Sequence, residues 1–579
     1  MAAQNMGSIG APRPLRSSTW LGDGGKNGFI ARHHLRQMGL SETQLGRPLV
    51  GIANTWSELT PCNAHLRSLA DDVRRGIASA GGVALEFPML SLGEPFLRPS
   101  SMLYRNMAAM ELEEMIRANP LDAVVVLTGC DKTTPAGLMG IASANLPAVL
   151  LTGGPMLNGR YRGRAVGSGT DIWRMTDELR AGTITHGDFV EFESSLNRSA
   201  GHCMTMGTAS SMACIAEALG MQLPGGAALP AVDSRRRVLA EQTGARAVEL
   251  AAEGLRPSDV LTPAAFRNAI VVNAAIGGST NAVLHLLALA GRAGVDISLD
   301  DLDVIGREVP MLVDLMPSGR YLMEEFAYAG GMPALLSRLA PMLDLTARTV
   351  GGSTIGEICA TGRVDDPVVI RSLDDPVQPA GSGTAVLRGN LAPDGAVIKV
   401  SAADPALLEH TGPALVFDAL EDYLAVLDEL DIDPATVLVV RNVGPRGYPG
   451  MPEVGNLPLP QKLLRAGIRD LVRISDARMS GTAFGACVLH VAPEAAAGGP
   501  LALVRTGDLV HLDVTGRRLD ILVDDEELVR RRADWSPPDP AETRGWVRLY
   551  TEHVLQADRG VDFDFLVGAS GSQPAKAPF

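Results

Sequence analysis

The sequence predicts an α/β protein with two domains: an N-terminal parallel sheet with helices on both faces, and a C-terminal β-rich, barrel-like domain. Three observations support this prediction. The chain has 579 residues, too many for one core, since domains average roughly 150 residues. Apolar runs of strand length alternate with helical patterns through the first part of the chain. Beyond about residue 384, short alternating runs separated by turns replace them.

The first half contains strands and helices in alternation. Buried strands are expected where short apolar runs are bounded by turn residues, at 48–55, 83–90, 122–129 and 147–154. Helices are expected between them, at 63–81, 102–118 and 135–146. In the first helix the apolar residues share one face, and Ser100 or Ser101 caps the second. Strand–helix–strand units of this length imply a parallel sheet covered by helices on both faces.

The remainder of the chain divides at a linker. Residues 200–330 have mostly helical patterns, with a Gly-rich helix start within 277–294, and residues 375–383 are a Pro/Gly-rich linker. A Pro393-Asp394-Gly395 turn then separates two alternating runs within 383–401. Further strands are expected at 436–444, 470–476 and 517–523. The predicted units are a disordered arm (1–25), an α/β domain (26–380), a β-rich domain (384–566) and a disordered tail (567–579).

Composition excludes several classes of partner. Lys and Arg number 51 against 66 Asp and Glu, a net charge of −15, so the basic surface that binds nucleic acid or anionic lipid is missing. No apolar run reaches the roughly 18 residues that span a bilayer, and the first residues lack the apolar core of a signal peptide. We therefore expect a cytoplasmic protein whose six cysteines stay reduced.

Reactive side chains follow the predicted strands. The first strand leads to Cys62, the second to Glu94, and the third directly to Cys130, Asp131 and Lys132. The carboxyl ends of parallel strands meet at one edge of a sheet, where sites form. That edge is predicted to bring together two thiols, two carboxylates and a lysine.

The six cysteines fall into two groups. Those in polar, Gly/Pro-containing loops are Cys62, Cys130 and Cys203, and those in apolar or Ala-rich surroundings are Cys214, Cys359 and Cys487. The second group is expected to fill the core. No C-x-x-C pair occurs, which argues against a structural zinc site. Spacing leaves two interpretations of the first group open: an iron–sulfur or other metal site assembled by the fold, and buried inert thiols.

Three loop carboxylates are candidate ligands for a hard cation. Glu94, Asp131 and Glu453 all lie in Gly/Pro-containing loops, and Mg²⁺ prefers carboxylate oxygens. Asp131 adjoins Cys130, so hard and soft ligands at this point could serve two different metals. Ser480 follows an apparent strand and precedes Gly481, a pattern typical of a tight turn. No G-x-S-x-G motif surrounds it, so the sequence does not indicate a nucleophilic serine.

Taken together, these segments resemble the family of dihydroxy-acid and 6-phosphogluconate dehydratases. The resemblance covers roughly residues 15–565. It rests on seven motifs in the family's order, "PCNAHL", "SLGEPFLRPSSMLYRN", "TGCDKTTPAG", "GHCMTMGTASSM", "GGSTNA", "GYPGMPE" and "SDARMSGT". The fourth and seventh are more similar to the sugar-acid branch, such as L-arabinonate and D-xylonate dehydratases, than to the branched-chain biosynthetic branch.

The resemblance implies a site made of two metal centres. By resemblance, Cys62, Cys130 and Cys203 ligate an iron–sulfur cluster, usually [2Fe–2S] in this branch, with [4Fe–4S] as the alternative. The residues implied around Mg²⁺ are Glu94, Asp131, Glu453 and Lys132, the last one carbamylated. Ser480 matches the family's proposed base, and Ser480 and Thr482 are candidate substrate contacts. No ligand position is replaced in this chain.

The implied function is that of a hydro-lyase acting on a small polyhydroxy carboxylate. Such an enzyme removes water from a 2,3-dihydroxy acid, for example L-arabinonate, D-xylonate or gluconate, and gives a 2-keto-3-deoxy acid. An alternative is a dihydroxy-acid dehydratase acting on 2,3-dihydroxyisovalerate or on short acids such as glycerate. A third interpretation, of another class, is a metal-free binding or structural protein. The resemblance also implies a homodimer or homotetramer with sites near the subunit interface.

Overall fold

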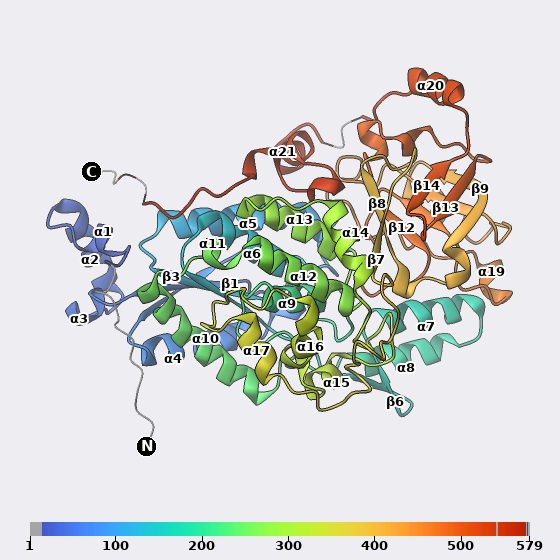
Figure 1. Ribbon diagram of the computed structural model, residues 1–579. Coiled ribbons are helices and arrows are strands. Elements are labelled where there is room, and N and C mark those ends of the chain that lie inside the picture. Colours follow the sequence, from blue (N-terminus) through green and yellow to red (C-terminus); the bar gives the residue numbers. More distant parts are fainter. Residues whose placement is uncertain (1–13, 540–541, 575, 577–579) are drawn as a thin grey trace.

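The computed structural model describes residues 14–539, 542–574 and 576, and it places an α/β domain beside a β-rich domain (Figure 1). The first sheet contains four parallel strands in the order β2-β1-β3-β4. These are β1 (Leu49–Asn54), β2 (Val83–Pro88), β3 (Ala123–Thr128) and β4 (Ala148–Thr152). All four lie within the ranges expected from the sequence, so the predicted parallel sheet is confirmed. Its central strands β1 and β3 are buried throughout.

Helices cover both faces of this sheet (Figure 1). One face carries α4 (Leu66–Ser79) and α10 (Ser234–Glu253), and the other carries α6 (Thr133–Ala144) with α5 (Arg105–Ala118) beyond it. Helix α4 buries the apolar stripe that its sequence shows. It meets α10 at Gly76 and Gly244, where any side chain would overlap the backbone of the other helix. Ser100 caps the turn before α5 by accepting a hydrogen bond from Met102 N–H at 3.2 Å.

Most other helices belong to the α/β domain, which confirms the mostly helical prediction for 200–330. They are α1 (Ser18–Leu21), α2 (Lys26–Gln37), α3 (Glu42–Leu45), α7 (Thr170–Ala181), α8 (His186–Leu196), α9 (Thr208–Ala218), α11 (Pro257–Val260), α12 (Pro263–Ala275), α13 (Asn281–Ala293), α14 (Leu299–Glu308), α15 (Met323–Tyr328), α16 (Gly331–Leu339) and α17 (Ile355–Thr361). A small hairpin of β5 (Gly159–Tyr161) and β6 (Arg164–Val166) precedes α7. Helices α7 and α8 extend beneath the β-rich domain (Figure 1). Within the described residues, no helix is both long and apolar enough to cross a bilayer.

The second domain is built on an eight-stranded mixed sheet in the order β14-β13-β9-β10-β11-β12-β8-β7. Its strands are β7 (Thr384–Leu387), β8 (Gly395–Lys399), β9 (Glu409–Phe417), β10 (Val437–Val440), β11 (Arg473–Ser475), β12 (Cys487–Ala492), β13 (Leu509–Asp513) and β14 (Arg518–Ile521). The two edges meet where Arg388 N–H donates to the Arg517 carbonyl and Leu519 N–H donates to the Arg388 carbonyl, each at 2.9 Å. The sheet is thus nearly closed, which confirms the barrel-like expectation.

Sequence patterns located five of these eight strands. The β7–β8 hairpin has the expected Pro393-Asp394-Gly395 turn, and β10, β11 and β14 lie within their predicted ranges. Strands β9, β12 and β13 were not predicted. Strand β9 contains Gly412 and Pro413, residues that normally indicate a turn. Short helices α18 (Leu420–Val426), α19 (Gln461–Arg465) and α20 (Asp525–Asp534) lie between or after the strands.

The last segment of the chain returns to the α/β domain, which differs from the expected domain end at 566. Helix α21 (Gly545–His553) packs there, and its Trp546 indole donates to the Leu103 carbonyl at 3.0 Å. Arg105, fully buried, donates to the carbonyls of Gly560 and Val561 at 2.9 and 2.8 Å. The physical reason is that the apolar side chains of this segment complete a core with α13 and the start of α5.

The described parts of both termini, which fall within the expected disordered arm (1–25) and tail (567–579), contact the α/β domain. Residues 1–13, 575 and 577–579 lie outside the described residues. The Arg16 guanidinium donates to the carbonyls of Asn119 and Ser572, at 2.5 and 2.6 Å. Ser17 N–H donates to the Asp122 carboxylate at 2.8 Å. These hydrogen bonds pair backbone carbonyls and a carboxylate at and just after the end of α5. The polar, Gly-rich composition of the termini does not reveal such long-range contacts.

Candidate active site

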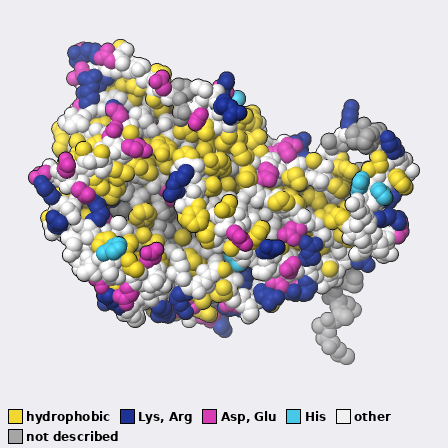
Figure 2. Space-filling model, turned by 180° about the vertical axis from the view of Figure 1, so that it is seen from behind, with side chains coloured by type: hydrophobic (Ala, Val, Ile, Leu, Met, Phe, Trp, Pro, Cys, Tyr) yellow, Lys and Arg dark blue, Asp and Glu magenta, His cyan; other side chains and the backbone are white. Residues whose placement is uncertain are grey.

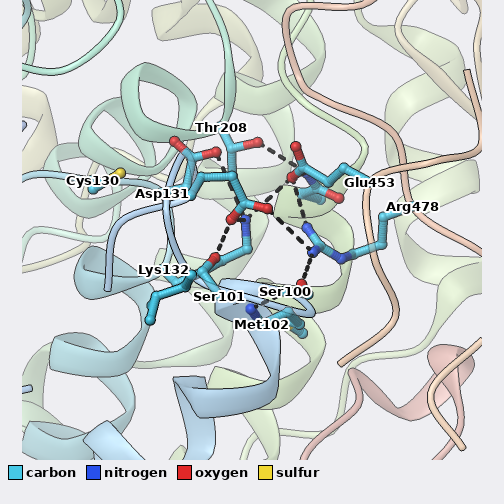
Figure 3. Close-up of polar contacts among 12 residues, drawn as sticks. Ser100, Ser101, Met102, Cys130, Asp131, Lys132, Thr208, Glu453 and Arg478 are labelled. Atoms are coloured by element: carbon cyan, nitrogen blue, oxygen red, sulfur yellow. Dashed lines mark hydrogen bonds and ion pairs between the residues drawn. The ribbon is translucent and has the colours of Figure 1, made fainter. Parts of the chain in front are cut away.

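Three carboxylates from the two domains converge on one point (Figure 3). Glu94 lies in the loop after β2, Asp131 lies in the loop after β3, and Glu453 comes from the β-rich domain. Figure 3 labels Asp131 and Glu453. One oxygen of each lies within 4.8 Å of the others. Lys132 projects among them, with Nζ at 3.1 Å from Glu94, 3.2 Å from Glu453 and 3.7 Å from Asp131. The predicted cluster of oxygen ligands is thus brought together by the fold.

Arg478 completes the charge pattern from the β-rich domain (Figure 3). Its guanidinium donates to Glu453 at 2.7 Å and to Ser100 Oγ at 3.0 Å, and it is fully buried. Ser101 donates its hydroxyl to Glu94. Sequence reasoning did not single out Arg478, Ser100 or Ser101 as site residues. Their signal was available, because all three lie inside the motifs that carry the family resemblance.

Burial and the two neighbouring cations shift the pKa values of the three acid groups in opposite directions. Burial raises the pKa of Glu94, but the charges of Lys132 and Arg478 outweigh it and bring that pKa down to about 2. Burial raises the pKa of Glu453 to about 7, against the effect of Lys132. Burial also raises the pKa of Asp131. The site holds more carboxyl groups than can all be ionised together. It therefore fits a divalent cation, which would stabilise all three groups as anions.

The lysine is held as an ammonium ion by the same carboxylates. Burial lowers the pKa of Lys132, but Glu94 and then Glu453 and Asp131 more than compensate, so the pKa is raised. An ammonium has no lone pair to offer a metal. The oxygen set therefore fits Mg²⁺, whereas Lys132 fits only after its charge has changed.

Three cysteines lie beside this cluster. The Cys62 thiol forms a hydrogen bond with Cys130, and this bond is the largest cause of a raised Cys62 pKa. Burial raises that pKa further, as do the charges of Cys130, Cys203 and Asp131. Burial and the charge of Asp131 raise the pKa of Cys203 to about 12. Asn63 joins the two loops by accepting a hydrogen bond from Cys130 N–H at 2.9 Å. Three thiols collected from three separate loops fit an iron–sulfur cluster, whose ligands are cysteine thiolates.

The other three cysteines are placed as the sequence predicts. Cys214, Cys359 and Cys487 are buried in α9, α17 and β12. Each belongs to the main apolar core. The Cys359 thiol lies 3.2 Å from the Leu336 carbonyl, a contact within the core. These cysteines are structural, and they serve as matched controls for the first three.

Two histidines hold the cysteine loops in place. His65 Nε2 lies 3.0 Å from the Gly153 carbonyl at the end of β4, and His202 Nδ1 lies 3.0 Å from the Cys203 carbonyl. Burial lowers the pKa of His202 to about 4 and also lowers the pKa of His65. Both are therefore neutral at pH 7, and they act as hydrogen-bond supports for backbone carbonyls.

Ser480 lies in a turn tied to the carboxylates. Asn281, at the start of α13, donates from Nδ2 to Glu453 at 2.7 Å and to the Met479 carbonyl at 3.1 Å. Ser480 Oγ is 2.9 Å from Thr482 Oγ1 and accepts a longer bond from Thr482 N–H at 3.4 Å. The next residue, Gly481, lies against Thr208 N, where a Cβ would come within 2.6 Å. The turn that holds the predicted base is thus connected to the oxygen cluster through Asn281, a residue that sequence reasoning missed.

Comparison with known proteins agrees with this arrangement. The family description "Dihydroxy-acid/6-phosphogluconate dehydratase N-terminal" matches residues 47–358, and the corresponding C-terminal description matches residues 368–561. The L-arabonate dehydratase of Azospirillum brasilense is 56% identical, with 98% of this chain and 99% of the relative aligned. The L-arabinonate dehydratase of Rhizobium leguminosarum bv. trifolii is 53% identical, with 98% of each chain aligned.

A more distant relative covers the same length. The D-xylonate dehydratase of Caulobacter vibrioides is 41% identical, with 96% of each chain aligned. Together the two family descriptions account for both domains and for every loop that contributes a carboxylate, cysteine or serine to the site. The chain therefore belongs to the dihydroxy-acid/6-phosphogluconate dehydratase family and is a hydro-lyase.

Proposed function

We propose that this hydro-lyase removes water from a sugar acid and gives a 2-keto-3-deoxy acid, with an iron–sulfur cluster and Mg²⁺ as cofactors. The observation that carries the proposal is the convergence of Glu94, Asp131, Lys132 and Glu453 beside three cysteines and Ser480. The names of the relatives, which are dehydratases of arabonate, arabinonate and xylonate, support a sugar acid as substrate.

The reaction needs a base at C2 and help for a poor leaving group at C3. When bound, the cluster and Mg²⁺ would supply Lewis-acid polarisation of the substrate's hydroxyl and carboxylate oxygens. Ser480 Oγ takes the proton from C2, and the Thr482 hydroxyl and N–H face that oxygen to stabilise its anion. Loss of the C2 proton and the C3 hydroxyl as water leaves an enol. The enol takes a proton at C3 and becomes the 2-keto acid.

Lys132 is proposed to carry a carbamate in the active enzyme. Converting an ammonium into a carbamate lowers the charge of the site by two, which is the charge that Mg²⁺ brings. The exchange therefore leaves the net charge among Glu94, Asp131, Glu453 and Arg478 unchanged, and it adds oxygen ligands. Because the carboxylates raise the Lys132 pKa, the side chain stays an ammonium ion. The neutral amine that reacts with CO₂ becomes available only when a cation competes with Lys132 for the carboxylates. We expect carbamylation to require Mg²⁺ and bicarbonate together.

Glu453→Gln, Asp131→Asn and Lys132→Arg are expected to lose Mg²⁺ binding and turnover while keeping iron. Each removes an anionic ligand, or prevents its formation, with little change in volume. The loss of turnover should exceed about 100-fold, because partners of ligands alone are typically worth about 10–100-fold. Metal analysis for magnesium and the visible spectrum for the cluster check this directly.

A matched control for these variants is Glu58→Gln. Glu58 is an exposed carboxylate in the loop before Cys62 and should leave magnesium, iron and turnover unchanged. Intact mass of the native protein in bicarbonate should reveal one added CO₂, absent from Lys132→Arg. A fully active, magnesium-loaded protein with unmodified Lys132 would contradict the carbamate.

The substrate is to be identified with a panel of acids. Anaerobically prepared protein would be assayed for 2-keto acid with L-arabinonate, D-xylonate, D-gluconate, 2,3-dihydroxyisovalerate and glycerate. The proposal expects the five- and six-carbon sugar acids to have the highest kcat/KM. Preference for 2,3-dihydroxyisovalerate would instead assign the chain to branched-chain dihydroxy acids, which the family description also covers.

We also propose that two or four copies assemble with the sites near their interface. Leu59 and Phe96 are 79% and 63% exposed, and they lie in the loops that carry Cys62 and Glu94. Hydrophobic side chains also gather in a broad area on the face seen in Figure 2. Exposed large apolar side chains close to a polar site are typical of a surface that a second subunit covers.

Leu59→Asp combined with Phe96→Asp is expected to shift the protein toward monomer and to lower turnover, because charges would enter an apolar interface. Sedimentation velocity at assay concentration measures the shift. The control is Val529→Asp, which changes a 69% exposed residue on α20 and should not alter assembly. A wild-type monomer with full activity would rule out the proposed assembly.

A further inference from the structure

Thr482, two residues after Ser480, is fixed on three sides. Its carbonyl accepts a hydrogen bond from Thr170 Oγ1 at 2.9 Å, and its hydroxyl oxygen accepts one from the Trp173 indole at 3.2 Å. Its methyl group lies against Gly207, where a Cβ would come within 2.7 Å of Cγ2. A β-branched side chain held at both branches has one χ1 rotamer available. The direction of the Thr482 hydroxyl is therefore set by its surroundings.

The groups that fix Thr482 come largely from the start of α7. Gly169, Thr170 and Trp173 lie within the first turn of that helix and face the same residue. Gly169 has φ +95°, and any side chain there would collide with Thr482. The other end of α7 is also joined to the β-rich domain, where Arg180 donates to the Leu459 carbonyl at 2.7 Å. Helix α7 is thus anchored at both ends to the domain that carries Ser480.

The hydrogen bonds have a defined direction when Ser480 is deprotonated. An indole N–H can only donate, so Thr482 Oγ1 accepts from Trp173. Within the described part of the chain, the one other partner of that hydroxyl is Ser480 Oγ at 2.9 Å. A serine anion can only accept, so Thr482 must donate to it. The bond from Trp173 polarises the Thr482 O–H and strengthens this donation.

The geometry points to Trp173 as a positioning residue for the base: its indole orients Thr482, whose hydroxyl in turn stabilises the anion of Ser480. This inference rests on the proposed function, in which Ser480 takes the C2 proton. The sequence alone led us to expect that Thr482 contacts the substrate. The inference instead assigns its hydroxyl to Ser480. Trp173 itself acts only through Thr482.

A double-mutant cycle tests this relay. Trp173→Phe removes the N–H and keeps a ring, and Thr482→Val removes the hydroxyl and keeps the shape. Each is expected to lower kcat about 10–100-fold with little change in KM, by analogy with the range typical of residues that orient metal ligands. The acidic limb of the kcat–pH profile should move to higher pH in both, because a less stabilised anion has a higher pKa. The double variant should be no slower than Thr482→Val.

Losses that multiply in the double variant would overturn the relay, because Trp173 would then act independently of Thr482. Trp535→Phe is the matched control, since this tryptophan packs near Gly498, on another part of the β-rich domain, and its replacement should leave kcat unchanged. Thr482→Ser, which restores a hydroxyl, should recover most of the rate lost in Thr482→Val.

A second measurement needs no turnover. The chain has five tryptophans, so ¹⁵N-labelled indoles give five signals, and the one missing in Trp173→Phe belongs to Trp173. Thr482→Val should shift that signal and Thr482→Ser should not. An unmoved signal in Thr482→Val would overturn the inference even in an active enzyme. Absence of dehydration with every sugar acid would refute the proposed function instead, while the indole signal would still report on the Trp173–Thr482 pair.

Discussion

Replacing Cys62, Cys130 or Cys203 by serine should abolish both the visible absorbance of the cluster and dehydratase turnover. These three thiols lie together beside Asp131. The hydrogen bond with Cys130, and then burial, raise the pKa of Cys62, and burial and the charge of Asp131 raise the pKa of Cys203. Thiolates in such surroundings require a strongly positive partner, which cluster iron provides. A serine hydroxyl ionises far less readily than a thiol and is a harder ligand, so it should not replace the missing thiolate.

Iron and sulfide analysis of anaerobically purified protein measures this loss. The matched controls are Cys214→Ser, Cys359→Ser and Cys487→Ser, whose thiols lie in the apolar core away from the polar loops. They should lose some thermal stability, because a hydroxyl replaces a buried thiol, but they should keep iron and colour. A colourless Cys359→Ser protein together with a coloured Cys62→Ser protein would overturn the assignment.

Ser480→Ala should lower turnover by at least about 10²–10⁴-fold, the usual contribution of a general base. The fold, cluster colour and substrate binding should be retained, because the change removes one oxygen from a half-buried turn residue and leaves the Ala483 N–H to Ser480 carbonyl bond of 3.0 Å intact. A free serine hydroxyl is a poor base at neutral pH. Donation from Thr482 and a nearby divalent ion would make its anion accessible.

Solvent-deuterium exchange at C2 separates the role of Ser480 as a base from a role in shaping the turn. The Ser480→Ala protein should bind the sugar acid yet fail to exchange its C2 proton. If exchange continued at the wild-type rate, another group would be the base and Ser480 would only form the turn. Substrate affinity, measured by calorimetry, should change little in either case.

The sequence predicted which loops come together at one edge of the first sheet. Cys62, Glu94, Cys130, Asp131 and Lys132 were placed correctly at one sheet edge, because the direction of parallel strands determines where their following loops lie. That inference needs only the alternation of strands and helices, which apolar periodicity reveals. Glu453 and Ser480 come from the other domain, and only the family motifs connected them to this edge.

Other features depend on contacts that no local pattern encodes. Arg478 and Asn281 lie inside motifs that carry the family resemblance, but their partners are far away in sequence, so the motifs alone do not show which residues they contact. The return of residues 545–566 to the α/β domain was missed for the same reason. Its amphipathic pattern indicates a buried face but not which domain buries it.

That returning segment has a consequence for how the protein is made. The ribosome releases residues 26–380 long before residues 560–562. Buried Arg105 needs the carbonyls of Gly560 and Val561, and buried Arg292 pairs with Asp562 at 2.6 Å. A buried guanidinium without its partners is strongly destabilising, so the nascent α/β domain should stay incompletely packed. Glu453 also emerges late. A stalled nascent chain that ends before Gly545 yet holds magnesium would contradict this order. Metal loading should therefore follow termination, which makes maturation a post-translational event.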